Sequence, residues 1–111
     1  MPKFDHIYQR RAFVPKEEPY FSGSFGWSSV CDHPHHYFKI DDDEFWRLYD
    51  SGVIWDWNDR HGTMLDEFEE GIYEDRLDTM LKEVIDSIGE GTISNAISTA
   101  IDEGTGVCFI F

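Results

Sequence analysis

Residues 73–89, YEDRLDTMLKEVIDSIG, form the segment that most clearly decides the fold. Apolar side chains recur here every three or four positions, the spacing that lines them up along one side of an α-helix. Charged residues fill the remaining positions, and Gly89 is a residue type at which helices commonly end. The pattern therefore predicts an amphipathic helix with one buried side. Its apolar residues are Leu77, Met80, Leu81, Val84, Ile85 and Ile88.

The segment that follows predicts a second helix and a strand. ISNAISTAIDE, residues 93–103, again has apolar residues at helical spacing and stops before Gly104. VCFIF, residues 107–111, is apolar at every position, which is typical of a strand buried on both faces.

The N-terminal part predicts two strands separated by loops. FDHIYQ, residues 4–9, and HHYFKI, residues 35–40, have the alternation and the aromatic content of strands, and RRAFV, residues 10–14, could extend the first of them. Prolines and glycines between them interrupt regular structure and predict loops. These breaking residues are Pro15, Pro19, Gly23 and Gly26.

A helix is predicted directly after the second strand, in DDDEFWRLYDSG. Asp41 is expected to cap it, with Glu44 at the third helical position completing a capping box. Ile40 and Phe45 have the spacing of the hydrophobic contact that often accompanies this motif. Gly52 is the expected end of the helix.

The next residues are predicted to form a strand, a turn and a short helix. VIWDW, residues 53–57, alternates as a strand does, and NDRHG, residues 58–62, is expected to be a turn. TMLDEFEEG, residues 63–71, is expected to form the short helix. Together these elements predict a single acidic α+β domain over residues 1–111, with a small, mostly antiparallel sheet and three to four helices packed on one face.

Charge restricts the class of partner. The chain has 111 residues and a net charge of −14, and residues 41–111 alone have a net charge of −15. Such a surface disfavours nucleic acid and anionic membranes and favours a basic protein partner. The N-terminus has no secretory signal, no apolar run is long enough to span a membrane, and two cysteines are too few for a secreted disulfide framework. We therefore expect a cytoplasmic protein; its oligomeric state stays open.

The combination of tryptophans and carboxylates between residues 43 and 59 suggests a partner-binding face. On the predicted helix, Trp46 lies between Asp43 and Asp50, which are three positions before it and four after it. The predicted strand and turn add further aromatic and acidic side chains. Tryptophan often anchors protein interfaces, and acids pair with Arg or Lys of a basic partner. The alternative is that all three tryptophans fill the core. The predicted face consists of Asp43, Trp46, Asp50, Trp55, Asp56, Trp57 and Asp59.

A second candidate site is CDHPHH, in which Cys31, His33, His35 and His36 are possible zinc ligands. Ligands this close in sequence rarely complete one tetrahedron, and a polar loop with solvated histidines is the alternative. No nucleophile elbow, zinc-protease helix or dinucleotide-binding motif is present, so the sequence predicts a non-catalytic protein without a cofactor.

The leading hypothesis is an inhibitor of the kind represented by bacterial immunity proteins, which neutralises a basic partner such as a nuclease toxin. One alternative is an acidic protein that imitates DNA and blocks a DNA-binding protein. Another is a metal-binding module that uses the segment from Cys31 to His36.

Overall fold

The computed structural model of the chain describes residues 9–16, 34–66 and 70–111. Most of the predicted strand FDHIYQ, the glycine-containing segment 17–33 and residues 67–69 lie outside the described residues. The elements, in chain order, are β1 Arg11–Pro15, β2 His35–Lys39, α3 Asp42–Asp50, α4 Val53–His61, β3 Glu70–Tyr73, α5 Asp75–Ile88, α6 Thr92–Glu103 and β4 Gly106–Ile110.

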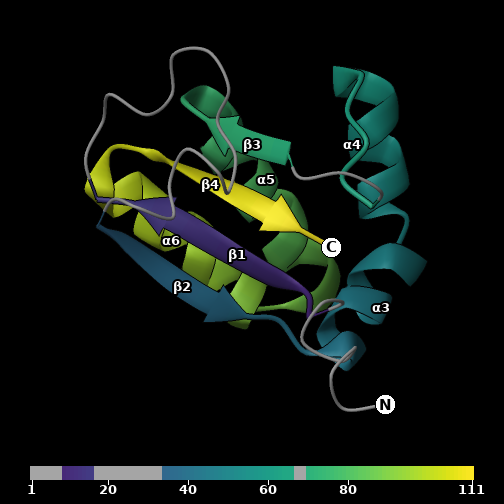
Figure 1. Cartoon of the computed structure of the whole chain (residues 1–111). Helices are drawn as coiled ribbons and strands as arrows, with labels where there is room; N and C mark the ends of the chain where they lie inside the picture. The colour runs from purple at the N-terminus through teal and green to yellow at the C-terminus, as the bar shows by residue number, and fades with distance from the viewer. Residues whose placement is uncertain (1–8, 17–33, 67–69) are drawn as a thin grey trace.

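The four strands form one antiparallel sheet in the order β2-β1-β4-β3. The first described strand and the last one lie side by side at its centre, with Phe13 opposite Cys108 (Figure 1). Strand β3 pairs with the other edge of β4, where Gly71 is opposite Cys108. The two central strands therefore come from opposite ends of the described chain.

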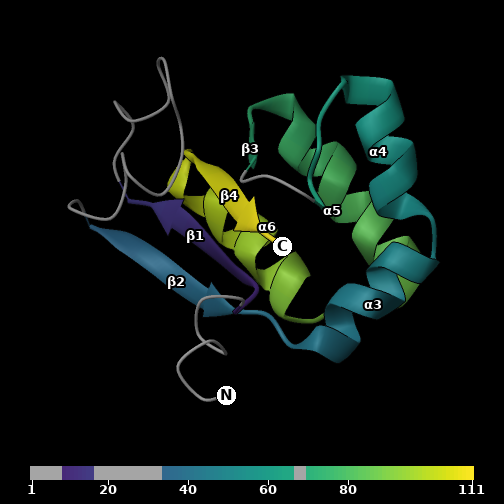
Figure 2. The ribbon, with the colours of Figure 1, turned by 45° about the vertical axis from the view of Figure 1, so that its right-hand side comes forward.

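Helices α5 and α6 form a second layer against one face of this sheet. Helix α6 packs on β1 and β4, and α5 packs on α6 and β3. Helices α3 and α4 lie together beyond one end of the sheet, where both contact α5 (Figures 1 and 2). The main core lies between the layers and takes alternate strand residues, among them Ala12, Val14, Ile72, Val107 and Phe109. The predicted α+β fold, with its small antiparallel sheet and its helices, is confirmed.

The strand, the turn and the short helix predicted between residues 53 and 71 are wrong. VIWDW, expected to be a strand, is the start of helix α4, which continues through the predicted turn to His61 and ends at Gly62 in the left-handed conformation. Aromatic and β-branched residues favour strands, but this preference is weak, and burial of Ile54 and Trp57 three positions apart favours a helix instead. The short helix predicted for TMLDEFEEG is not found either, since residues 63–66 are irregular and strand β3 starts at Glu70.

The predicted capping box of α3 is also wrong. Asp41 is the N-cap residue, but its side chain makes no capping hydrogen bond. The carboxylate of Glu44 instead accepts hydrogen bonds from the backbone N–H groups of Thr92, at 3.2 Å, and Ile93, at 2.7 Å. These are the first two residues of α6, whose N-terminal N–H groups have no partner within the helix and attract negative charge. The almost fully buried Glu44 therefore fastens α3 to the start of α6.

Gly91 leaves the space that this contact needs. A Cβ atom at Gly91 would lie 2.8 Å from Oε2 of Glu44, closer than such atoms approach in proteins. The backbone N–H of Gly91 donates to Oγ of Ser94 at 2.8 Å, which satisfies another of the N-terminal groups of α6.

We predict that Glu44→Ala lowers the free energy of unfolding by about 2 kcal/mol, because a buried and a partly buried N–H group lose a charged acceptor. Asp50→Ala, an exposed change in the same helix, is the control and is expected to stay within about 0.5 kcal/mol of wild type. Urea unfolding measures both. Equal losses in the two variants would contradict the proposed role of Glu44.

Candidate protein-binding site

The three tryptophans of the predicted face separate into two environments. Trp46 on α3 and Trp55 on α4 are 48% and 67% exposed, whereas Trp57 is completely buried. Two positions along a helix correspond to a rotation of about 200°, so Trp55 and Trp57 point to opposite sides of α4. The prediction that Trp57 belongs to the binding face is therefore wrong; it is a core residue.

Tyr49 joins the two exposed tryptophans into one surface. The indole Nε1–H of Trp55 points at the hydroxyl oxygen of Tyr49 at 3.4 Å. The ring of Trp46 meets the ring of Tyr49 edge to face, with 5.4 Å between centroids. We call Trp46, Tyr49 and Trp55 the aromatic strip. It crosses from α3 to α4, so neither helix alone would form it.

The aromatic strip is continuous with the core. Trp46 packs edge to face on Phe45 at 5.0 Å, and Phe45 lies 5.1 Å from Phe111. Phe111 in turn stacks on Phe109 of strand β4 at 5.0 Å. This series of ring contacts packs α3 against the sheet and restricts the orientation of the exposed Trp46 ring.

Carboxylates surround the strip. Residues 41–66, which contain both helices, include eight acidic and two basic residues, a net charge of −6. Asp43, Asp50, Asp56 and Asp59 are all exposed. Of these four, only Asp56 forms an ion pair with a cationic side chain in the part of the chain that the structure describes. Three carboxylates beside the aromatic strip are thus available to an external cation.

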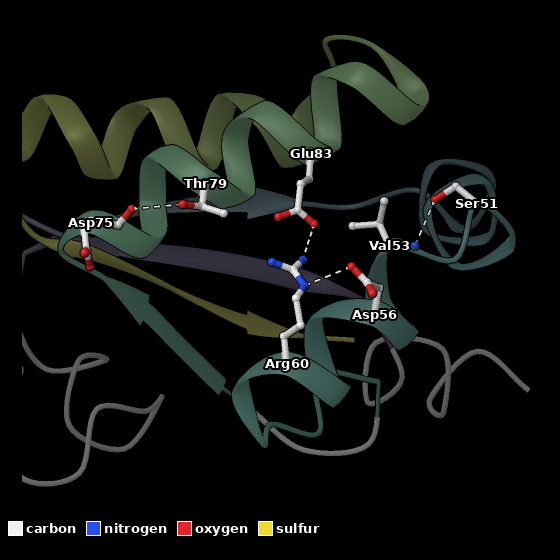
Figure 3. A network of polar contacts seen from close by, with 7 residues as sticks. All are labelled: Ser51, Val53, Asp56, Arg60, Asp75, Thr79 and Glu83. Atoms are coloured by element: carbon white, nitrogen blue, oxygen red, sulfur yellow. Dashed lines mark hydrogen bonds and ion pairs between the residues drawn. The ribbon is translucent and has the colours of Figure 1, made fainter.

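Arg60 uses the paired carboxylate to join α4 to α5. Its Nε donates to Asp56 at 2.9 Å and its Nη2 donates to Glu83 at 2.5 Å. The guanidinium therefore lies between the two helices (Figure 3). The hydrogen bond with Glu83 is the main cause that raises the pKa of Arg60. Asp56 therefore helps to position α4 and is less available to a partner than Asp59.

An open groove of about 710 Å³ runs along the outer side of α4. Asn58 shapes one wall, because its amide donates to Asp66 at 2.9 Å while its oxygen accepts from the hydroxyl of Thr63 and the backbone N–H of Leu65. No local sequence pattern indicates this role of Asn58, because it depends on residues that follow the helix. The groove is lined by Gly52, Trp55, Asp56, Asn58, Asp59, Thr63, Met64 and Asp66.

The two described histidines of the candidate metal site do not converge. His36 is opposite Val14 in the register of β1 and β2, on the helix-covered face, and its Nε2 lies 2.5 Å from Glu103 of α6. His35, one residue earlier, points to the other face, where its ring lies 6.2 Å from that of Phe13. The two therefore cannot bind the same ion. Cys31 and His33 lie outside the described residues, and no group of three potential ligands occurs among the residues that are described.

Comparison with protein-family models, with curated proteins and with solved structures found no match to this chain. Within residues 9–16, 34–66 and 70–111, none of the helices has the length and apolar character needed to cross a membrane.

The different burial of the tryptophans predicts different effects on stability. Trp57→Ala removes a fully buried ring and is expected to cost about 3–5 kcal/mol of unfolding free energy. Trp55→Ala removes a ring that is mostly in solvent and is expected to cost less than about 1 kcal/mol. Chemical denaturation of both variants tests this, and a large loss in Trp55→Ala would show that its ring is part of the core.

His61 at the end of α4 predicts a pH effect on stability. Its ring lies 4.0 Å from that of Trp57, and its Nε2 is buried without a hydrogen-bond partner among the described residues. Burial is the main cause that lowers the pKa of His61 below 6.5, and the charges of Arg76 and Arg60 lower it further. The unfolded chain therefore binds the proton more tightly, so the contribution of His61 to stability falls as the pH drops below about 6.5.

We expect the wild type to lose more unfolding free energy than His61→Gln between about pH 7.5 and about pH 5.5. The other titrating groups are common to both proteins, so the difference between their pH profiles isolates His61. Parallel profiles would contradict the lowered pKa.

Proposed function

We propose that this protein is a non-catalytic inhibitor that binds a basic protein partner through the acidic face of α3 and α4. The proposed class is the bacterial immunity protein, acting in the cytoplasm on a nuclease toxin. The observation that supports it is the exposed aromatic strip, which is flanked by carboxylates that have no ion-pair partner among the described residues.

The exposed rings supply the affinity in this proposal. Trp46 and Trp55 are 48% and 67% exposed, so the free energy of burying these rings is not gained in the isolated protein. Contiguous apolar surface of this kind commonly marks an interaction site. Tryptophan and tyrosine are frequent hot-spot residues because a partner can bury much area on a side chain with few rotatable bonds. A non-polar centre also favours an inhibitor with a hydrophobic anchor over a DNA mimic, which needs rows of charge.

The carboxylates supply the association rate and the selectivity. A net charge of −6 over residues 41–66 attracts a cationic surface before contact is made. A nuclease binds phosphates through cationic side chains, so the same carboxylates would pair with those side chains and exclude the nucleic acid. Asp43, Asp50 and Asp59 are the residues assigned to this role.

Capture of partners from an extract of the native host, with immobilised protein at low and at moderate salt, tests the proposal. We expect one basic protein that remains bound at moderate salt, because buried aromatic contacts are not screened. Trp46→Ala combined with Trp55→Ala should abolish its recovery, with dissociation accelerated at least about tenfold. Asp43→Lys combined with Asp50→Lys should mainly slow association.

Asp102→Lys is the matched control, since it reverses an exposed charge near the C-terminal end of α6. Capture should be unaffected by this variant. Recovery of many basic proteins that all dissociate as salt rises, with equal effects of charge reversal at Asp102 and at Asp43, would show that the charge acts only as a general polyanion and would contradict the proposal.

A further inference from the structure

We infer that the groove beside Trp55 binds an arginine side chain of the partner, with the guanidinium over the indole and paired with Asp59. This inference rests on the proposed function and names the chemical group that the binding face recognises. It is argued from two arrangements in which the chain's own arginines already combine an aromatic ring with a carboxylate.

The first arrangement is on α3. The guanidinium of Arg10 forms an ion pair with Asp42 and lies 4.1 Å from the ring centroid of Phe45 and 5.4 Å from that of Trp46. Asp42 and Trp46 are four positions apart, so they are neighbours on one side of the helix. One cation thus satisfies the carboxylate and covers part of the adjacent rings.

The second arrangement is on the inner side of α4. The guanidinium of Arg60 lies 5.5 Å from the ring centroid of Trp57 and pairs with Asp56 at 2.9 Å. Asp56 and Trp57 are consecutive in the sequence, and both contact Arg60 because it lies four and three positions further along the helix.

Trp55 and Asp59 have the four-residue spacing of Asp42 and Trp46, in the reverse order, and lie on the outer side of α4. Trp55 is the most exposed of the large apolar side chains of the described chain, at 67%. Neither residue has a cationic partner in the described part of the chain, where the two arginines above make all the cation–π contacts. Trp55 and Asp59 therefore form a third pair of ring and carboxylate, and this pair lacks only a cation.

The shape and charge of the groove fit such an occupant. Its volume of about 710 Å³ exceeds what one side chain needs, so backbone of the partner can enter with it. Gly52, one turn before Trp55, has no side chain to obstruct the groove, and a Cβ there would meet nothing within 4 Å. Of the other carboxylates in the groove, Asp56 already pairs with Arg60 and Asp66 accepts from Asn58, which leaves Asp59 as the principal acceptor.

Arginine suits this arrangement better than lysine. Its planar guanidinium stacks on an indole face while its N–H groups point outward in the plane toward a carboxylate. A lysine ammonium is more strongly hydrated and has no flat surface to lay on the ring.

The test is an NMR titration of the full-length, isotope-labelled protein with the peptide acetyl-Gly-Arg-Gly-amide. We expect saturable shifts of the Trp55 indole N–H and of the backbone amides around Asp59, with a dissociation constant of about 1–10 mM, as befits a single side chain. The same peptide with citrulline, which has nearly the same shape without the charge, should bind at least about tenfold more weakly. A lysine peptide should bind more weakly than arginine.

Asp59→Asn keeps the size of the side chain and should weaken the arginine peptide at least about threefold, whereas the control Asp102→Asn should not. Shifts that do not saturate, equal binding of citrulline, or shifts centred elsewhere would overturn the inference. If the arginine peptide does not bind while host-extract capture still depends on Trp46 and Trp55, the proposed function is retained and the inferred arginine site is wrong. If the peptide binds but no basic partner is captured from the host extract, the arginine site is retained and the proposed inhibitor function is wrong.

Discussion

The arrangement of the helices depends on the contact between the carboxylate of Glu44 and the first turn of α6. Helix α6 lies against the centre of the sheet, and α3 lies beyond the sheet's end, so a bond between them transmits the position of one to the other. The contact places a negative charge at the positive end of a helix and satisfies two N–H groups at once, the buried one of Ile93 and the partly buried one of Thr92. Phe45, the next residue, then packs on Phe111, and Trp46 is left at the surface.

This construction separates the acids by role. Glu44 stabilises the fold, and Asp42 and Asp56 are paired with the chain's own arginines. Asp43, Asp50 and Asp59 lie on the same two helices but form no ion pair in the described part of the chain. Unpaired negative charge therefore lies beside two exposed indoles on this face, and a partner with both apolar and cationic groups would complement it.

The sequence predicts the helices and strands that local residue patterns determine, and it does not predict features that depend on contacts between residues far apart in the chain. Helices α5 and α6 and strand β4 follow from spacing, whereas the sequence left open which of the three tryptophans are exposed. Helix α4 was mistaken for a strand because Val53, Trp55 and Trp57 alternate; the signals that favour a helix were the spacing of Ile54, Trp57 and His61 and the glycine after it. The true partner of Glu44 is nearly fifty residues away, so no local motif indicates it.

The proposed function requires that Trp46 and Trp55, which are exposed in the free protein, become covered by a partner. Hydroxyl-radical footprinting of the labelled protein, alone and in an extract of the native host, tests this without knowledge of the partner. The internal references are Tyr37 on β2 and Tyr73 on β3, which are also exposed. We predict that oxidation of both tryptophans falls severalfold in the extract while that of the tyrosines changes little. Unchanged oxidation of the tryptophans, or an equal fall at all four residues, would contradict the account.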